Sequence, residues 1–200
     1  AAARYNVGYY IGLRSRLADI RLTREIVAEL PDYDLVLFRN PFPVTPRAYL
    51  SPQPKPVPSR VDPAMLLTQP DFLRGAVDVI ETTNDTLPGP SRNGTATIAR
   101  YRPEEVLVRV DAPQPAVLIL LDAFEQGWTA TLENGAPIPV LRANALVRAV
   151  VVPAGAHTVT FAYQTPLLKA GAWASLAGAL LCLGLLSRAG RRIRSAEDRP

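Results

Sequence analysis

The sequence predicts a mainly β protein: an antiparallel β-sandwich, jelly-roll-like, with a small α/β N-terminal portion and one C-terminal transmembrane helix. From Thr95 onward, short β-rich segments follow one another at intervals of roughly ten residues, as in a sandwich. The run Ala170–Ser187 carries no charge, and as a helix it would span roughly 27 Å, close to the hydrocarbon thickness of a bilayer. Arginines follow this run, which is typical of the cytoplasmic end of a membrane span.

These observations divide the chain into four parts. We expect an α/β N-terminal portion over residues 1–94, with a proline-rich segment at 41–58, then an extracytoplasmic β-sandwich over 95–166, a transmembrane helix over 167–187 and a cytoplasmic basic tail over 188–200. An outside domain without an export signal of its own is expected to follow earlier membrane spans.

The first forty residues mix strand and helix patterns. Tyr5–Ile11 is rich in aromatic and β-branched residues and is predicted to be a strand. Ser15 is expected to cap a helix that runs to about Leu30. Leu35–Phe38 has the pattern of a short buried strand. The prolines of segment 41–58 predict an extended, irregular chain, either a linker or a structured extension, because proline cannot donate to a sheet.

The next segment contains one helix start and one strand. Asp62 followed by Pro63 is the order of a capping residue and a first helical residue. Ala76–Glu81 is predicted to be a strand. Residues 82–94 form a polar loop, whose Asn-x-Thr triplets at Asn84 and Asn93 would accept glycans only in a eukaryotic secretory route.

Seven strands are predicted in the sandwich: Thr95–Tyr101, Val106–Asp111, Ala116–Asp122, Trp128–Glu133, Ile138–Leu141, Leu146–Val152 and His157–Tyr163. Asn134-Gly135 predicts a tight hairpin in which both residues have positive φ. Pro137 and Pro139 place the strand that follows at a sheet edge. Pro153 and the residues after it mark another turn.

Composition and charge exclude several classes of function. The net charge is +4, but the tail beyond Ser187 carries five arginines against Glu197 and Asp198, so the rest of the chain is nearly neutral. We therefore expect no nucleic acid partner. Cys182 is the only cysteine, which excludes a disulfide or a thiolate metal site within one chain. No metal and no cofactor are expected.

No catalytic constellation is predicted in this chain. His157 is the only histidine, and the alternation of its strand places it on the apolar face, where a structural role is expected. Glu104 and Glu105 are adjacent in a strand, so they point to opposite faces and are expected to be solvated. Sequence motifs for nucleotide binding or nucleophilic catalysis are absent from the sequence.

The candidate binding surface lies between two predicted strands. Asp122, Phe124 and Trp128 offer aromatic faces and a carboxylate, and Tyr101 is the fourth candidate. Aromatic faces and carboxylate acceptors can bind sugars, so these four residues are predicted to contact a glycan. The alternative is that Trp128 fills the core while Gly127 permits a bulge.

The predicted membrane anchor has a polar residue at each end. Its residues are Lys169, Trp173, Arg188, Arg191 and Arg192. Small residues four positions apart, such as Gly171 and Ser175, would permit close packing against other spans of the same protein. The alternative is a buried helix of a soluble core.

Several segments in order resemble one family of bacterial membrane proteins. They are NVGYYI, NPFPVTPRAYL, ARYRPEEVLVRVDA and the stretch from LILLDAFEQGWTATLENG to HTVTFAY, and the strongest pieces are Pro46–Tyr49, Gly127-Trp128 and Val152–His157. Together they resemble the C-terminal part of YfhO-family proteins, over most of the chain. That family usually has Tyr-Tyr-Pro before the Gly-Trp pair, where this sequence has Phe124-Glu125-Gln126.

The resemblance implies a polytopic, GT-C-like glycosyltransferase of the bacterial cytoplasmic membrane. Such proteins transfer sugars from polyprenyl-phosphate carriers to cell-envelope polymers, and their catalytic carboxylates are expected in upstream loops, so none is assigned here. The implied partners are membrane lipid, the remaining transmembrane helices, and an envelope glycan or polyprenyl-phosphate sugar. The alternatives are a non-catalytic, membrane-anchored sugar- or protein-binding module and a structural assembly domain.

Overall fold

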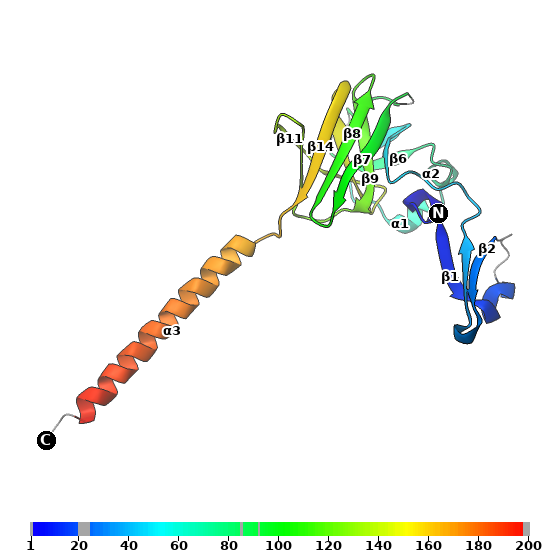
Figure 1. The fold of residues 1–200 in the computed structure, drawn as a ribbon. Coiled ribbons are helices and arrows are strands. Elements are labelled where there is room, and N and C mark those ends of the chain that lie inside the picture. The colour runs from blue at the N-terminus through cyan, green and yellow to red at the C-terminus, as the bar shows by residue number, and fades with distance from the viewer. Residues whose placement is uncertain (1, 20–24, 85, 92, 198–200) are drawn as a thin grey trace. The chain divides into compact units, whose positions relative to one another are not determined.

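The computed structural model describes residues 2–19, 25–84, 86–91 and 93–197, with only the backbone given at 17–19, at 169 and at 185–197. Most of its elements are strands in antiparallel sheets, so the predicted mainly β class is confirmed (Figure 1). The chain forms two units, Ala1–Tyr163 and Gln164–Pro200, and all the sheets belong to the first.

Among the described residues, the first half of the chain contains six strands and several short helices. In order they are η1 (Ala2–Tyr5), β1 (Tyr9–Leu13), η2 (Arg14–Asp19), β2 (Ile26–Leu30), η3 (Pro31–Tyr33), β3 (Leu35–Arg39), β4 (Ala48–Leu50), β5 (Pro54–Val57), α1 (Pro63–Leu66), α2 (Pro70–Leu73) and β6 (Asp78–Glu81). The second half contains β7 (Thr95–Arg102), β8 (Glu105–Ala112), β9 (Ala116–Ala123), β10 (Trp128–Thr131), β11 (Pro137–Ile138), β12 (Leu141–Ala143), β13 (Val147–Val152), β14 (Gly155–Tyr163) and α3 (Leu168–Glu197).

Two sheets form the body of the first unit. One has five strands in the order β11-β10-β14-β8-β7, and the other has six in the order β4-β9-β13-β12-β6-β5. β8 pairs with β14 in the first sheet and β9 pairs with β13 in the second, so strands far apart along the chain pair within each sheet.

The main core lies between these two sheets. Val108 and Phe161 from the five-stranded sheet are fully buried against Leu118 and Val150 from the six-stranded sheet. Alternate residues of each strand supply this core, as expected when one face of a strand points inward.

The six-stranded sheet is also covered on its outer face. Val117, Ile119 and Ala149 are buried there, with Tyr5 of η1 packed against the same cluster. Because both faces of β9 are covered, its residues 116–120 read as a continuous apolar run rather than an alternating pattern.

The predicted helix from Ser15 to about Leu30 is wrong. Residues 14–19 form the 3₁₀ helix η2, residues 20–24 lie outside the described part, and Ile26–Leu30 is the strand β2, paired with β3. The carboxylate of Asp34 accepts hydrogen bonds from the backbone N and the hydroxyl of Ser15, at 3.0 and 2.5 Å, which closes a turn instead of capping a helix. The small sheet β1-β3-β2 that results starts at Tyr9, four residues after the predicted start.

The proline-rich segment is more regular than its composition suggests. It contains β4, which pairs with β9, and β5, which pairs in parallel with β6. β5 lies at the edge of the sheet, where Pro54 and Pro56 need not donate hydrogen bonds to a neighbour. The segment is therefore part of the sandwich and not a linker.

The predicted helix cap and the predicted edge-strand proline are confirmed, and the predicted hairpin is modified. Asp62 caps α1 by accepting a hydrogen bond from Ala64 N at 2.8 Å. Pro137 lies in the edge strand β11 as predicted, but the predicted strand Ile138–Leu141 divides into β11 and β12, which belong to different sheets. At the hairpin before β11, Gly135 has φ of +79°, whereas Asn134 does not have a positive φ.

The second unit contains α3, which begins at Leu168 and extends ten residues beyond the predicted end at Ser187. Its described side chains include exposed hydrophobic residues, among them Trp173, Leu180 and Leu181. Within the part of the chain that the structure describes, no helix has the length and apolar character needed to cross a membrane.

Candidate functional site

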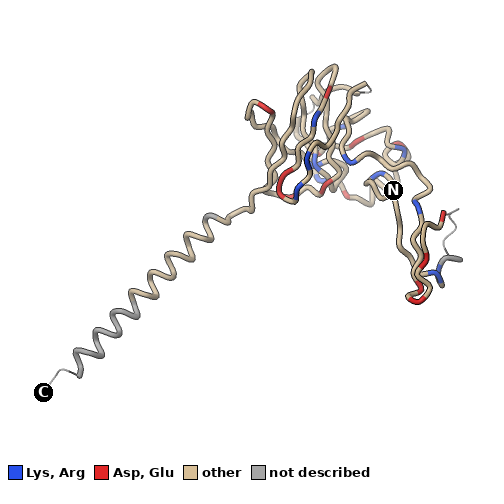
Figure 2. The backbone as a smooth tube through the Cα atoms, in the orientation of Figure 1, with Lys and Arg blue, Asp and Glu red and all other residues tan. Residues whose placement is uncertain are grey.

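A pocket of about 370 Å³ lies at one end of the sandwich, and both sheets contribute to it. Tyr101 and Trp128 come from β7 and β10 of the five-stranded sheet. Asp122 and Arg148 come from β9 and β13 of the six-stranded sheet, and Arg47 directly precedes β4. Figure 2 shows basic and acidic positions close together at the lower end of the sandwich.

Strand alternation explains why these side chains meet. Asp122 follows Leu118 and Leu120 on β9, and Arg148 precedes Val150 on β13, so both lie on the face that forms the core. Tyr101 is opposite Val106, which is also a core residue. The polar pocket is therefore the end of the hydrophobic core, with charged residues at inward-facing positions.

Asp122 is the centre of the charge network. Its Oδ1 accepts hydrogen bonds from Arg47 Nε and Nη2, at 2.9 and 2.7 Å, and its Oδ2 accepts one from Arg148 Nη2 at 2.8 Å. Arg47 Nη2 also lies 2.5 Å from the hydroxyl of Tyr101, and its guanidinium lies 4.3 Å from the centre of that ring. One carboxylate thus holds two arginines in fixed positions.

Arg148 is buried to an unusual degree for a charged side chain. Its side chain is 2% exposed, and its guanidinium lies 3.6 Å from the centre of the Trp128 ring. The Nε and Nη1 atoms are buried without a hydrogen-bond partner. Such unmet donors cost about 1–3 kcal/mol, which the contact with the ring offsets in part.

The surroundings shift the acidity of both arginines. The hydrogen bonds that Arg47 donates to Asp122 are the main cause that raises the pKa of Arg47. Burial is the main cause that lowers the pKa of Arg148, and the charge of Asp122 opposes this effect. Both guanidinium groups remain charged, since arginine does not lose its proton in proteins.

Three of the four predicted glycan contacts line this pocket. Tyr101, Asp122 and Trp128 are brought together, while Phe124 lies outside the pocket and packs under the guanidinium of Arg142 at 4.9 Å. Trp128 also packs against the main core, as the alternative interpretation expected. Because Arg148 covers its ring, Trp128 acts mainly as a support for that arginine.

Sequence reasoning did not identify the arginines of the pocket. Arg148 interrupts an apolar strand at an inward-facing position, and such a charge requires a buried partner. That signal could have been found from the alternation of the strand. The pairing of Arg47 with Asp122 joins residues 75 positions apart and has no local signal.

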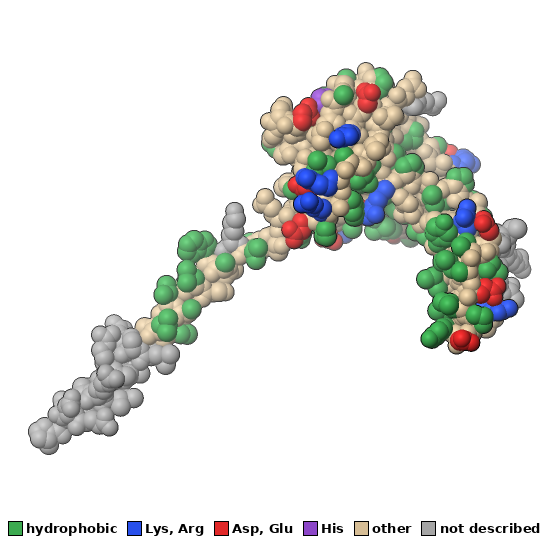
Figure 3. All heavy atoms as spheres, in the orientation of Figure 1, with side chains coloured by type: hydrophobic (Ala, Val, Ile, Leu, Met, Phe, Trp, Pro, Cys, Tyr) green, Lys and Arg blue, Asp and Glu red, His purple; other side chains and the backbone are tan. Residues whose placement is uncertain are grey.

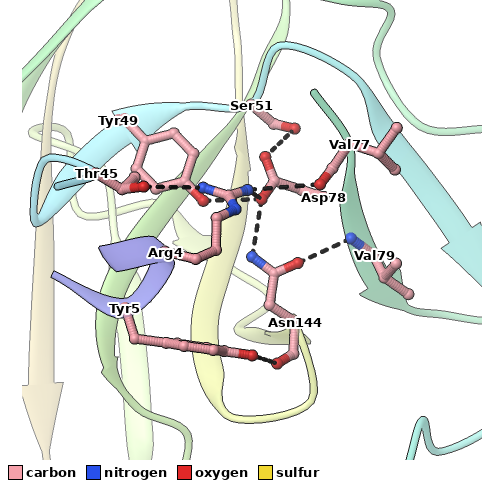
Figure 4. A network of polar contacts seen from close by, with 9 residues as sticks. All are labelled: Arg4, Tyr5, Thr45, Tyr49, Ser51, Val77, Asp78, Val79 and Asn144. Atoms are coloured by element: carbon pink, nitrogen blue, oxygen red, sulfur yellow. Dashed lines mark hydrogen bonds and ion pairs between the residues drawn. The ribbon is translucent and has the colours of Figure 1, made fainter. Parts of the chain in front are cut away.

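A second polar cluster is buried beneath the six-stranded sheet (Figure 4). Asp78 is fully buried, forms an ion pair with Arg4, and accepts hydrogen bonds from Tyr49, Ser51 and Asn144 at 2.7–2.8 Å. Burial and the nearby carboxylate of Asp78 raise the pKa of Tyr49 well above its usual value. This network fastens η1 to the sandwich, and we assign it a structural role.

His157 pairs with an acidic side chain and a backbone carbonyl near the start of β14. Its side chain is 18% exposed, with Nδ1 2.9 Å from Glu133 Oε1 and Nε2 3.2 Å from the carbonyl oxygen of Ala154. These two contacts hold the His157 ring in place, so we assign this residue a structural role. Among the described residues, no group of histidine, cysteine and acidic side chains could hold a metal ion.

Comparison with protein-family models, with curated proteins and with solved structures finds no match for this chain. The resemblance to the YfhO family therefore stays a prediction based on its residues.

Proposed function

We propose that this chain is the C-terminal extracytoplasmic accessory lobe and last membrane span of a polytopic membrane protein that resembles YfhO-family glycosyltransferases. In this proposal the sandwich binds a glycan in its terminal pocket and does not itself catalyse transfer. The observation that carries the proposal is the pocket of Arg47, Tyr101 and Asp122, which combines an exposed aromatic ring with fixed charged groups.

The size and lining of the pocket fit a saccharide. Pockets of about 300–1,000 Å³ suit small ligands, and this one holds about 370 Å³. Tyr101 is 49% exposed and offers a ring edge and a hydroxyl, while the exposed carboxylate of Glu125 could accept hydrogen bonds from sugar hydroxyls.

The membrane part of the proposal is supported by sequence and by exposure. The uncharged run Ala170–Ser187 continues past Gly184, the last residue of α3 whose exposure is described. The exposed hydrophobic side chains of α3, shown in green in Figure 3, would be stabilised in an apolar surrounding. Arg188, Arg191 and Arg192 follow the run, which supports a cytoplasmic end.

Glycan binding can be tested with the 200-residue chain in detergent micelles. We expect saturable binding to oligosaccharides from bacterial envelope polymers, and Tyr101→Ala should weaken it about tenfold. Tyr33→Ala is the matched control, because Tyr33 is an exposed tyrosine that does not line the pocket. Equal binding by all three proteins, or no binding at all, would contradict the proposed pocket.

Membrane insertion can be tested by fluorescence. In the variant Trp128→Phe, Trp173 is the only tryptophan, so its emission reports on α3 alone. With vesicles of phosphatidylethanolamine and phosphatidylglycerol, we expect a blue shift and quenching by brominated acyl chains. Replacing Leu180 and Leu181 together by arginine should abolish both signals. If the unsubstituted helix leaves Trp173 in water, the membrane span is disproved.

A further inference from the structure

We propose that the pocket recognises the anionic group of its ligand, a phosphate or a carboxylate carried on a sugar, and that Arg47 and Arg102 contact this group directly. This inference rests on the proposed glycan binding and adds the chemical class of the ligand.

The charges that line the pocket do not balance. Arg47, Arg102 and Arg148 face two carboxylates, Asp122 and Glu125, so the lining keeps a net positive charge of one. Asp122 already serves two arginines, and its single charge cannot neutralise both. An anion in the pocket would complete this balance.

Two of the arginines have donors available. The hydrogen bonds of Arg47 use Nε and Nη2, which leaves Nη1 without an acceptor among the described residues, and this side chain is 46% exposed. Arg102 is exposed, lines the same pocket and has no ion pair within the described ranges. Guanidinium N–H groups bind phosphate and carboxylate, so Arg102 can offer a pair of donors and Arg47 can add the N–H groups of Nη1.

The buried residues hold Arg47 in position. Trp128 supports Arg148, Arg148 binds one oxygen of Asp122, and the other oxygen of Asp122 binds Arg47. Arg148, Asp122 and Trp128 are positioning residues, since their contacts fix the guanidinium that meets the ligand. A donor fixed in advance loses less conformational freedom when a ligand binds.

The pocket also favours a sugar over a free ion. Its volume of about 370 Å³ exceeds what a single phosphate or carboxylate group occupies. Tyr101 and the acceptor Glu125 would be unused by a small anion, and Glu125 would repel one that lacked hydroxyl groups to donate to it. The lining thus combines an anion site with acceptors for hydroxyls.

The test measures binding of four probes to the 200-residue chain in micelles by calorimetry: glucose 1-phosphate, glucuronate, glucose and inorganic phosphate. We expect one of the two charged sugars to bind about tenfold more tightly than glucose, and to weaken as salt is added. Which one binds distinguishes a phosphate ligand from a carboxylate ligand.

Three variants connect this binding to the pocket. Arg47→Gln should weaken binding of the charged sugar about tenfold, while Arg47→Lys should retain part of the affinity because it keeps the charge but not the guanidinium that Asp122 holds in place. Arg109→Gln is the control, since Arg109 is an exposed arginine of the same sandwich that lines a different pocket.

The remaining outcomes overturn the inference in different ways. Glucose binding as tightly as the charged sugars would refute the anion site and leave the proposed glycan binding intact. Inorganic phosphate binding as tightly as glucose 1-phosphate would mean an adventitious ion only. No binding by any of the three sugars would refute the inference, and the proposed function falls with it only if the envelope oligosaccharides also fail to bind. Equal losses in Arg47→Gln and Arg109→Gln would show that the pocket is not the binding site.

Discussion

Asp78 is expected to contribute more to stability than any exposed charge of the chain. The substitution Asp78→Asn preserves the shape of the side chain but removes the charge that faces the buried guanidinium of Arg4. Both side chains are at most 3% exposed, so Arg4 cannot regain hydration without local unfolding. Removing one partner of a buried pair costs about 3–5 kcal/mol.

The hydrogen bonds of the network raise this cost further. Tyr49, Ser51 and Asn144 all donate to the carboxylate of Asp78, and the Nε atom of Arg4 already lacks a partner. An amide in place of the carboxylate accepts fewer of these donors. We therefore expect the loss to fall in the upper part of that range.

Urea unfolding, followed by circular dichroism, measures this loss as a change in the unfolding midpoint. With a slope of about 2 kcal/mol/M, the midpoint should fall by roughly 2 M. The control is Asp71→Asn, which breaks an exposed ion pair with Arg74 and should cost less than about 1 kcal/mol. Adding Arg4→Met to Asp78→Asn should recover stability, because no uncompensated charge then remains buried. If Asp78→Asn costs no more than the control, the reasoning about this network is wrong.

Three further predictions concern other parts of the sandwich. The hydrogen bond between His157 and Glu133 raises the pKa of His157 and lowers the pKa of Glu133 to about 2. The pair therefore stabilises the fold fully between about pH 4.5 and 6.5, and this stabilisation is lost at higher pH as His157 deprotonates and at lower pH as Glu133 protonates. An NMR titration of the single histidine should give a pKa above 6.5, and in Glu133→Gln this pKa should fall back toward 6.5. Gly94→Ala should destabilise by about 1–3 kcal/mol in urea unfolding, since its Cβ would lie 2.7 Å from a backbone oxygen of β8; an unchanged midpoint would refute this close packing. Arg148→Met should alter the emission of Trp128, measured in Trp173→Phe, and an identical spectrum would contradict the stacked arrangement.

The β-rich half of the chain was the most predictable part, because its elements are encoded locally. Strands from Thr95 onward alternate or carry continuous apolar runs, and turns such as Pro153–Gly155 have residues suited to them. The sequence between Ser15 and Leu30 misled because its apolar spacing also fits a helix, whereas pairing of Ile26–Leu30 with β3 favours a strand.

The pocket was predictable in part, and the reason is the distance between its residues along the chain. Tyr101, Asp122 and Trp128 belong to strands that the pattern identifies, and alternation places them inward. Arg47 lies among the prolines of the segment 41–58, where the pattern predicts no strand pairing. Only the pairing of β4 with β9 brings Arg47 to Asp122.

The three strands that the residues before Thr95 add to the six-stranded sheet have a consequence for how the chain can be divided. β4 covers one margin of the six-stranded sheet, and the β5-β6 ladder covers the other. A fragment that begins at Thr95 would therefore expose unpaired main-chain donors and acceptors along both β9 and β12. Exposed edge strands of this kind pair with other chains and cause aggregation. We therefore expect that a fragment able to fold without self-association must include β4, β5 and β6 as well as the later strands.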